Sequence, residues 1–190
     1  CAFSTDNYIN SLSIPHALKN KIGVMINGSD VLSQGNSTND IDEVLKGLFK
    51  PRKKSPVSLV RIACHLHEFE YCLPAVTWLK GQGYKVGFNL MQINNASDES
   101  ITEVLNLANK YPIDVLYFAD SMGSLNAKQI TSIVKTIKKN WMGPIGIHTH
   151  DSMGNAVNNT MQALKDGVSW VDCTVTGMGR GPGNAQTEYL

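Results

Sequence analysis

The sequence predicts an α/β fold built around a parallel sheet, and three observations support this. Short apolar runs recur along the chain, and helix-like segments with apolar residues at helical spacing lie between them. From residue 57 onward the runs begin 26 to 30 residues apart, the length of a strand plus a crossover helix. The runs are apolar on both presumed faces, which is typical of parallel strands buried between two layers.

Six runs are expected to be strands, and they cover residues 22–26, 57–63, 84–91, 114–119, 144–148 and 170–175. Apolar stripes predict helices after most of them, for example Ile130, Val134 and Ile137 in one helix. The first connection differs, because residues 27–39 are polar and rich in glycine. We expect a mobile loop there, followed by a short helix over residues 40–48.

Two architectures have such a sheet: an open doubly wound sheet and a TIM (β/α)₈ barrel. The glycine-rich dinucleotide fingerprint and the P-loop lysine are absent from the sequence. Polar residues instead follow several different strands, where barrel enzymes assemble their active sites. These residues are Asn27, His65, His67, Asn89, Asp120, Ser121, His148, His150 and Asn184. The barrel is therefore favoured.

A complete barrel has eight strands and typically about 250 residues, whereas this chain has 190 residues and six visible strands. The chain also begins at Cys1 without a methionine. We expect residues 1–190 to form one partial aldolase-type barrel domain that lacks the first two strands.

The composition describes an ordinary globular chain, with 42% hydrophobic residues and a net charge of +1. This balance gives no general attraction to nucleic acid or to an anionic membrane. The sequence contains no apolar run of membrane-spanning length and no signal peptide. The cysteines, Cys1, Cys64, Cys72 and Cys173, are scattered, as is usual for reduced thiols. We expect a cytoplasmic protein with a small-molecule substrate, and a homo-oligomer is possible.

His148 and His150 flank Thr149 in the motif His-Thr-His-Asp. Alternate residues of a strand face the same way, so both imidazoles should project from one face. Imidazole is the commonest protein ligand for transition metals, although an H-x-H pair can also be a hydrogen-bonded core pair. Asp151 could orient one of the rings.

The run from residue 177 to residue 184, Gly-Met-Gly-Arg-Gly-Pro-Gly-Asn, follows the next strand. It can bring Asn184 to the histidines as a third ligand. A tight loop or a phosphate cradle would use the same glycines. Arg180 is either an anion clamp or a solvated charge.

Two further constellations are candidates for substrate contacts. Asp120 and Ser121 precede Gly123 at the end of a strand, and the exposed backbone amides of such a turn can hold a carboxylate; the alternative is a simple helix cap. His65 and His67 form a second H-x-H that overlaps a helix start. A structural or substrate-contacting role is favoured there over a second metal site.

Residues 148–156, HTHDSMGNA, and residues 177–185, GMGRGPGNA, resemble the metal-binding signatures of the DRE-TIM metallolyases, the HMGL-like family. The Ala-Asp-Ser-Met-Gly segment at residues 119–123 also resembles that family's Asp-Ser/Thr-x-Gly turn. The resemblance covers about residues 21 to 190 and is strongest to the 4-hydroxy-2-oxovalerate aldolase branch. Each motif alone is common, whereas the two at this separation are specific.

The resemblance implies a barrel that binds one divalent cation through His148, His150 and Asn184. Mn²⁺ is the expected ion, with Mg²⁺, Co²⁺ or Zn²⁺ as alternatives, and a nitrogen-rich pair suits Mn²⁺, Co²⁺ or Zn²⁺ better than Mg²⁺. The family's Asp-Arg motif on the first barrel strand is absent from this sequence, and activity of these residues alone is therefore doubtful.

The implied reaction is cleavage of a 4-hydroxy-2-oxo acid to pyruvate and an aldehyde. We expect Ser121, Asp120 and Arg180 to bind the substrate, and the sequence assigns no general base. Two other functions share this pattern: an acetyl-CoA-dependent acyltransferase of the isopropylmalate synthase type, and a non-catalytic metal-binding barrel.

Overall fold

The computed structural model describes residues 4–32 and 38–190. Its centre is a six-stranded parallel sheet in the order β1-β2-β3-β4-β5-β6. The strands are β1 (Ile22–Asn27), β2 (Val57–Cys64), β3 (Lys85–Leu90), β4 (Val115–Asp120), β5 (Ile145–Thr149) and β6 (Trp170–Val171). The parallel α/β fold predicted from the sequence is confirmed.

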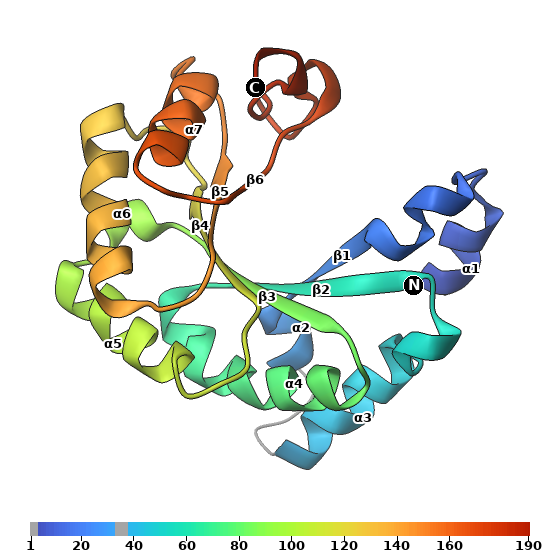
Figure 1. Cartoon of the computed structure of the whole chain (residues 1–190). Helices are drawn as coiled ribbons and strands as arrows, with labels where there is room; N and C mark the ends of the chain where they lie inside the picture. Colours follow the sequence, from blue (N-terminus) through green and yellow to red (C-terminus); the bar gives the residue numbers. More distant parts are fainter. Residues whose placement is uncertain (1–3, 33–37) are drawn as a thin grey trace.

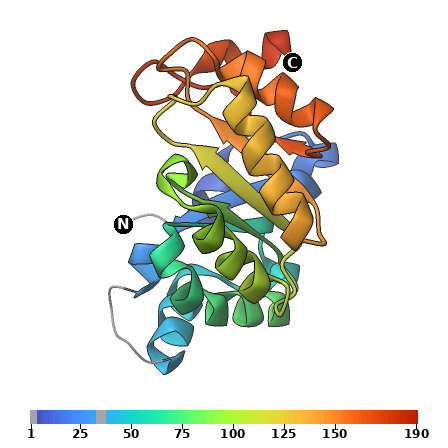
Figure 2. The ribbon, with the colours of Figure 1, turned by 90° about the vertical axis from the view of Figure 1, so that its left-hand side faces the viewer.

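Helices cover the convex face of the curved sheet (Figure 1). The longer helices are α3 (Thr38–Leu48), α4 (Phe69–Gly81), α5 (Asp98–Ala108), α6 (Ala127–Asn140) and α7 (Ala156–Lys165). Figure 2 shows α5 and α6 side by side over the strands. The short helices are α1 (Thr5–Ser11), α2 (Gly28–Leu32), η1 (His16–Lys21), η2 (Arg52–Lys54), η3 (Leu66–Glu68), η4 (Ile93–Asn95), η5 (Val175–Gly177) and η6 (Thr187–Tyr189). None of the helices in the described ranges is both long and apolar enough to cross a bilayer.

Local signals explain where the covering helices begin. Asn126 accepts hydrogen bonds from the backbone N–H groups of Lys128 and Gln129, and Gln129 closes a capping box. Ser97 caps α5 in the same way through Ser100. The apolar stripes predicted for these helices are buried against the outer face of the sheet. The main core therefore lies between the sheet and its helices.

The inner, concave face of the sheet carries polar side chains, contrary to the expectation of strands apolar on both faces. Arg61 of β2, Asn89 of β3 and Tyr117 of β4 lie at the alternate positions of their strands from the helix-packed residues Ile62, Phe88 and Phe118. Because each of these polar groups finds a partner inside, burial on this face does not require apolar residues.

Two local expectations are corrected. Residues 170–175 were expected to be a strand, but β6 ends at Val171. The backbone N–H of Thr174 bonds instead to the carbonyl of Ala185 in the returning loop, which draws the chain away from β5. Residues 28–32 of the expected mobile loop form helix α2. The rest of that expected loop includes residues 33–37, which lie outside the described residues.

β1 and β6 are the two edges of the sheet and are not paired with each other. Figure 1 shows the curved sheet open between them. Six adjacent parallel strands with outer helices have the curvature and layering of a TIM barrel. Closure by eight strands, and which two strands would complete it, stay predictions.

Candidate functional site

A cavity of about 590 Å³ opens at the carboxyl ends of the strands. Loops that follow five of the six strands contribute to its wall, as expected for a barrel-type site. Its lining comprises Met25, Asn27, Ala63, His65, Asn89, Met91, Gln92, Ala119, Ser121, Met122, His148, His150, Ser152, Arg180, Gly181 and Pro182. No aspartate or glutamate of the described residues lines the cavity, so it is suited to an anionic ligand.

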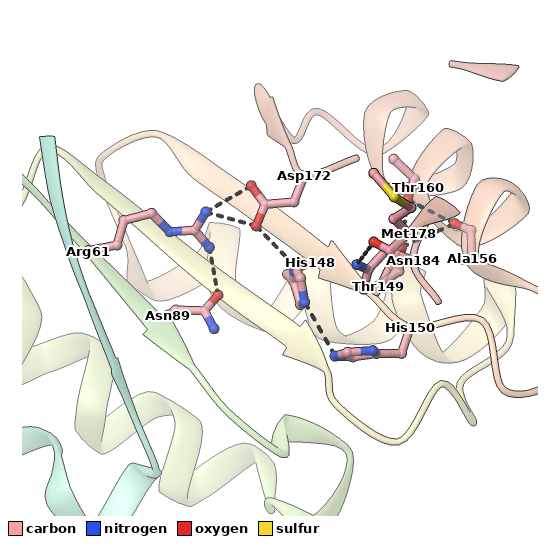
Figure 3. A network of polar contacts seen from close by, with 10 residues as sticks. All are labelled: Arg61, Asn89, His148, Thr149, His150, Ala156, Thr160, Asp172, Met178 and Asn184. Carbon is pink, nitrogen blue, oxygen red and sulfur yellow. Dashed lines mark hydrogen bonds and ion pairs between the residues drawn. The ribbon is translucent and has the colours of Figure 1, made fainter. Parts of the chain in front are cut away.

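His148 and His150 lie together on the cavity wall, at and just beyond the end of β5 (Figure 3). Between them Thr149 faces the opposite way, where its hydroxyl hydrogen-bonds with that of Thr160 on α7 at 3.0 Å. This buried contact anchors the strand end and turns both imidazoles inward. Their Nε2 atoms are 3.3 Å apart.

A chain of polar contacts continues from His148 into the interior (Figure 3). Nδ1 of His148 is 2.9 Å from Oδ2 of Asp172. The Nη1 of Arg61 donates to both carboxylate oxygens of Asp172 at 2.8 Å, and its Nη2 donates to Oδ1 of Asn89 at 2.9 Å. The guanidinium also stacks on the ring of Tyr117. These contacts hold Asp172 directly behind the histidine.

The charges around this chain shift two pKa values. Burial alone would raise the pKa of Asp172, but the hydrogen bond from His148 and the positive charge of Arg61 outweigh it, and the pKa lies below its usual value. Burial lowers the pKa of His150, and the nearby His148 and Arg180 lower it further. His150 therefore favours the neutral form that a metal ligand requires.

Asn184 lies beside the histidines because the glycine-rich loop folds back onto them. Its backbone forms an antiparallel bridge with His150, and the N–H of Asp151 donates to the carbonyl of Gly183. The side-chain Nδ2 of Asn184 donates to the carbonyl of Met178 at 3.0 Å. Its Oδ1 is buried and has no hydrogen-bond partner within the described part of the chain. Such a buried oxygen is a free donor for a cation.

The geometry of the histidine pair fits one divalent cation. Two imidazole nitrogens bound to the same ion at about 2.1 Å lie about 3.0–3.4 Å from each other, and the observed separation is 3.3 Å. Asp172 supplies the outer carboxylate that metal-binding histidines commonly have. No group of three or more His, Cys, Asp or Glu side chains suited to a metal occurs in residues 4–32 and 38–190. The candidate donors in the cavity wall are thus the two neutral imidazoles, and the amide oxygen of Asn184, which does not line the cavity, stays a prediction as the third.

Ser121 and Asp120 have separate positions at the end of β4. Ser121 lines the cavity, and its Oγ accepts a hydrogen bond from the backbone N–H of Gln92 at 3.0 Å. Asp120 is fully buried, and its carboxylate accepts from the N–H groups of Ser124 and Leu125. Asp120 therefore shapes the turn that presents Ser121, whereas the cap of helix α6 is Asn126, so the capping alternative does not describe this turn.

Gly123 allows the turn to contact the next loop. Its φ is +59°, and a β-carbon there would lie 2.6 Å from the backbone nitrogen of Ser152 and 2.8 Å from the carbonyl oxygen of His150. Only glycine permits both the left-handed backbone and this approach. The Ser121 turn and the histidine loop are thereby held together.

Three candidates from the sequence remain to be placed: Arg180, His65 and His67. Arg180 lines the cavity from an exposed loop position. His65 also lines it, whereas His67 lines a neighbouring cavity of about 390 Å³. The two rings are stacked, with centroids 5.6 Å apart, so they do not converge on a shared point.

No pattern in the sequence indicated that four side chains would contact one another, those of Arg61, Asp172, Asn89 and Tyr117. Arg61 pairs with Asp172 across 111 residues, and no local pattern reports such a contact. One signal was present, because Arg61 is a charged residue in the middle of an otherwise apolar strand. A buried charge requires a partner.

The chain is similar to proteins named as aldolases over about 70% of its length. It is 36% identical over 138 residues to a 4-hydroxy-2-oxovalerate aldolase of Geobacillus thermodenitrificans, which is 72% of this chain and 40% of that protein. It is 34% identical over 134 residues to the enzyme of that name from Brevibacillus brevis, or 70% of this chain and 39% of that protein. The chain thus spans about two fifths of the length of these relatives.

Solved structures show the same arrangement. The N-terminal domain of a putative aldolase from Bacteroides vulgatus superposes with a TM-score of 0.72 at 27% identity, over 88% of this chain and 52% of that one. The carboxyl transferase domain of Rhizobium etli pyruvate carboxylase gives a TM-score of 0.72 at 16% identity, over 88% of this chain and 29% of that one. The second likeness concerns the fold alone.

A family model described as HMGL-like matches residues 13–190. This match includes every strand of the sheet and the whole cavity wall. The chain belongs to the HMGL-like family.

Proposed function

We propose that this chain is part of a divalent-metal-dependent aldolase that cleaves a 4-hydroxy-2-oxo acid to pyruvate and an aldehyde. The observation that carries the proposal is the pair of Nε2 atoms, 3.3 Å apart, in the wall of a cavity that is lined by no acidic side chain of residues 4–32 and 38–190. The relatives named as 4-hydroxy-2-oxovalerate aldolases support the same reaction class. Mn²⁺ is the proposed ion, with Co²⁺ and Zn²⁺ as alternatives, because imidazole nitrogens suit these three ions better than Mg²⁺.

His148 and His150 would hold the cation through Nε2, with the free Oδ1 of Asn184 as a third donor. A bound divalent cation supplies Lewis-acid polarisation of the substrate's 2-oxo group. The remaining contribution of these residues is position, because the Asp172 contact and the buried Thr149 anchor fix the direction of the imidazoles.

Ser121 is suited to the substrate carboxylate. Its oxygen already accepts from the N–H of Gln92, so its own proton is free to point into the cavity and donate. Arg180, at an exposed loop position, adds a positive charge to the lining of the same cavity. A 2-oxo acid would therefore meet a hydroxyl donor and a cation, while no carboxylate of the lining would repel it.

Two features limit what the 190 residues can do alone. Their donor set for the cation is uncharged, which lowers its affinity. Arg61 is engaged by Asp172 and Asn89, so the described site offers no buried arginine free for the enolate oxygen. Loss of one preorganised donor typically costs about 10²–10³ in rate.

The test is pyruvate release from 4-hydroxy-2-oxo acids with and without Mn²⁺, measured on residues 1–190 and on the complete barrel. We expect metal-dependent activity in the complete barrel and almost none in residues 1–190. His148→Ala and His150→Ala should abolish it, while His16→Ala, at an exposed position remote from the cavity, should not.

Three results would contradict the proposal in different ways. Equal rates of pyruvate release by residues 1–190 and by the complete barrel would show that the chemistry needs only these 190 residues. Transfer of an acetyl group from acetyl-CoA without aldol cleavage would support the acyltransferase alternative. Metal binding without turnover of either substrate class would support a non-catalytic barrel.

A further inference from the structure

We propose that Asp172, clamped by Arg61, is a positioning residue that keeps the proton of neutral His148 on Nδ1 and leaves its Nε2 lone pair facing His150. The inference rests on the proposed metal-dependent function and deepens it. It assigns a role to an ion pair in the interior of the barrel, which belongs to neither the cavity wall nor the metal-binding motifs.

The contact between Asp172 and His148 fixes which nitrogen carries the proton. A carboxylate accepts hydrogen bonds, so the nitrogen 2.9 Å from its Oδ2 must be the donor. That nitrogen is Nδ1, and a neutral imidazole carries only one proton. Nε2 of His148 therefore has a free lone pair directed at Nε2 of His150, 3.3 Å away.

In the metal-free chain, this proton position allows the two imidazole rings to form one hydrogen bond with each other. With the lone pair on His148, the 3.3 Å contact is satisfied by a proton on Nε2 of His150. A cation bound by both nitrogens would lie off the line that joins them, and His150 would then carry its proton on Nδ1 instead of Nε2. His148 needs no transfer of its own proton to become a ligand, which is the advantage of preorganisation.

Arg61 determines where the Asp172 carboxylate lies. Nη1 of Arg61 contacts both oxygens at 2.8 Å, while Asn89 and the Tyr117 ring hold the guanidinium from two other strands. Asp172 directly follows the two-residue strand β6, and its backbone N–H still donates to the carbonyl of Ile147 in β5 at 3.0 Å. The side-chain contact to β2 adds a second restraint, which fixes the carboxylate itself.

A purely structural role for the ion pair is the competing explanation. Breaking a buried pair by removing one partner is destabilising by itself, and loss of stability would not distinguish the two roles. The position of the histidine proton does distinguish them, because a brace that only supports the fold would leave it unchanged.

The test is nitrogen-15 NMR of the His148 ring in the metal-free chain at about pH 8, above the ordinary histidine pKa of about 6.5. Wild type, Asp172→Ala, Asp172→Asn and Asp172→Glu are compared, with Mn²⁺ affinity measured by calorimetry. Asp114→Asn is the matched control, since Asp114 pairs with Lys80 at 2.9 Å and lies outside the cavity wall.

We expect the proton on Nδ1 in wild type and a shift toward Nε2 in Asp172→Ala, with Mn²⁺ affinity about 10–100-fold lower. Asp172→Asn keeps a hydrogen-bond acceptor but loses the ion pair with Arg61, so its proton position and Mn²⁺ affinity should be intermediate. Asp172→Glu should restore part of the wild-type proton position and affinity. Asp114→Asn should match wild type in both measurements.

The proposal is overturned if Asp172→Ala keeps the proton on Nδ1, or if Asp114→Asn shows the same losses. Should Asp172→Ala not fold, the spectrum of Asp172→Asn decides, and a wild-type proton position with wild-type affinity in that variant overturns the proposal. A wild-type chain that binds no Mn²⁺ would refute the metal site, whereas the proton position would still decide the role of Asp172.

Discussion

The guanidinium of Arg61 lies 3.6 Å from the centre of the Tyr117 ring, and both side chains are shielded inside the sheet's concave face. Burial raises the pKa of Tyr117 to about 12; the negative charge of Asp172 adds to this increase and Arg61 opposes it. The phenol is thus kept neutral in the folded chain well above the pH at which an exposed tyrosine ionises.

This pKa shift predicts a loss of stability in alkali. Between about pH 10 and pH 12 the unfolded chain releases the Tyr117 proton while the folded chain retains it, so the free energy of unfolding should fall as pH rises. The difference between wild type and Tyr117→Phe should change by up to about 2–3 kcal/mol across that window. Urea unfolding at several pH values measures it, and parallel curves for the two proteins would contradict the assignment.

Gly183→Ala should be far more destabilising than Gly154→Ala. Both glycines have positive φ, +95° and +69°, so each alanine incurs a backbone cost of about 1–2 kcal/mol. At Gly183 the new β-carbon would also lie 2.1 Å from the carbonyl oxygen of Gly177, whereas at Gly154 nothing lies within 4 Å.

We therefore expect Gly183→Ala to cost about 3 kcal/mol or more and to displace the loop that carries Asn184. Gly154→Ala serves as the control for the backbone cost alone. Denaturant unfolding of the two variants measures the difference, and equal losses would show that the loop relaxes freely around the added carbon.

Ser121→Ala should weaken substrate binding with little effect on stability. The variant removes the donor proposed for the substrate carboxylate, and a hydrogen bond to a charged group contributes about 1.5–3 kcal/mol. KM for the 4-hydroxy-2-oxo acid should therefore rise about tenfold or more in the complete barrel. Ser124→Ala, exposed and outside the cavity lining, is the control; an unchanged KM in Ser121→Ala would remove Ser121 from the site.

Single substitutions of the histidine pair should remove the cation site. His148→Ala or His150→Ala leaves one imidazole and a neutral amide, so calorimetric titration with Mn²⁺ should show a loss of about 100-fold or more. Chelation with EDTA should reverse any Mn²⁺-induced stabilisation of wild type. His67→Ala, outside the main cavity, should bind as wild type does, and equal binding by all variants would place the cation elsewhere.

The periodic parts of the fold were predictable because they depend on local pattern. Strands β2 to β5 lie within one or two residues of the predicted runs, since buried parallel strands are continuous apolar segments. β6 was overestimated because the residues after Val171 look like a strand locally, while their hydrogen bonds go to a loop that returns from residue 185. Helix α2 was missed because glycine and serine open it.

The candidate site likewise has parts that the sequence predicts and parts that it does not. His148 and His150 could be paired from the sequence because strand alternation alone puts them on one face. Asp120 was considered for the substrate, but its carboxylate is used by two backbone amides a few residues away, a contact that no motif of the sequence had indicated. The Asp172 contact depends on how far the sheet curves, which no local pattern records.

The Arg61–Asp172 pair joins β2 to the residue after β6, which are separated by 111 residues of chain. It can close only after the intervening strand and helix units have stacked in order, because loop closure over that length must be compensated by contacts already made. The pair therefore belongs to the last stage of folding, and weakening it should accelerate unfolding far more than it slows refolding. This partly buried ion pair would then limit how long the folded state survives.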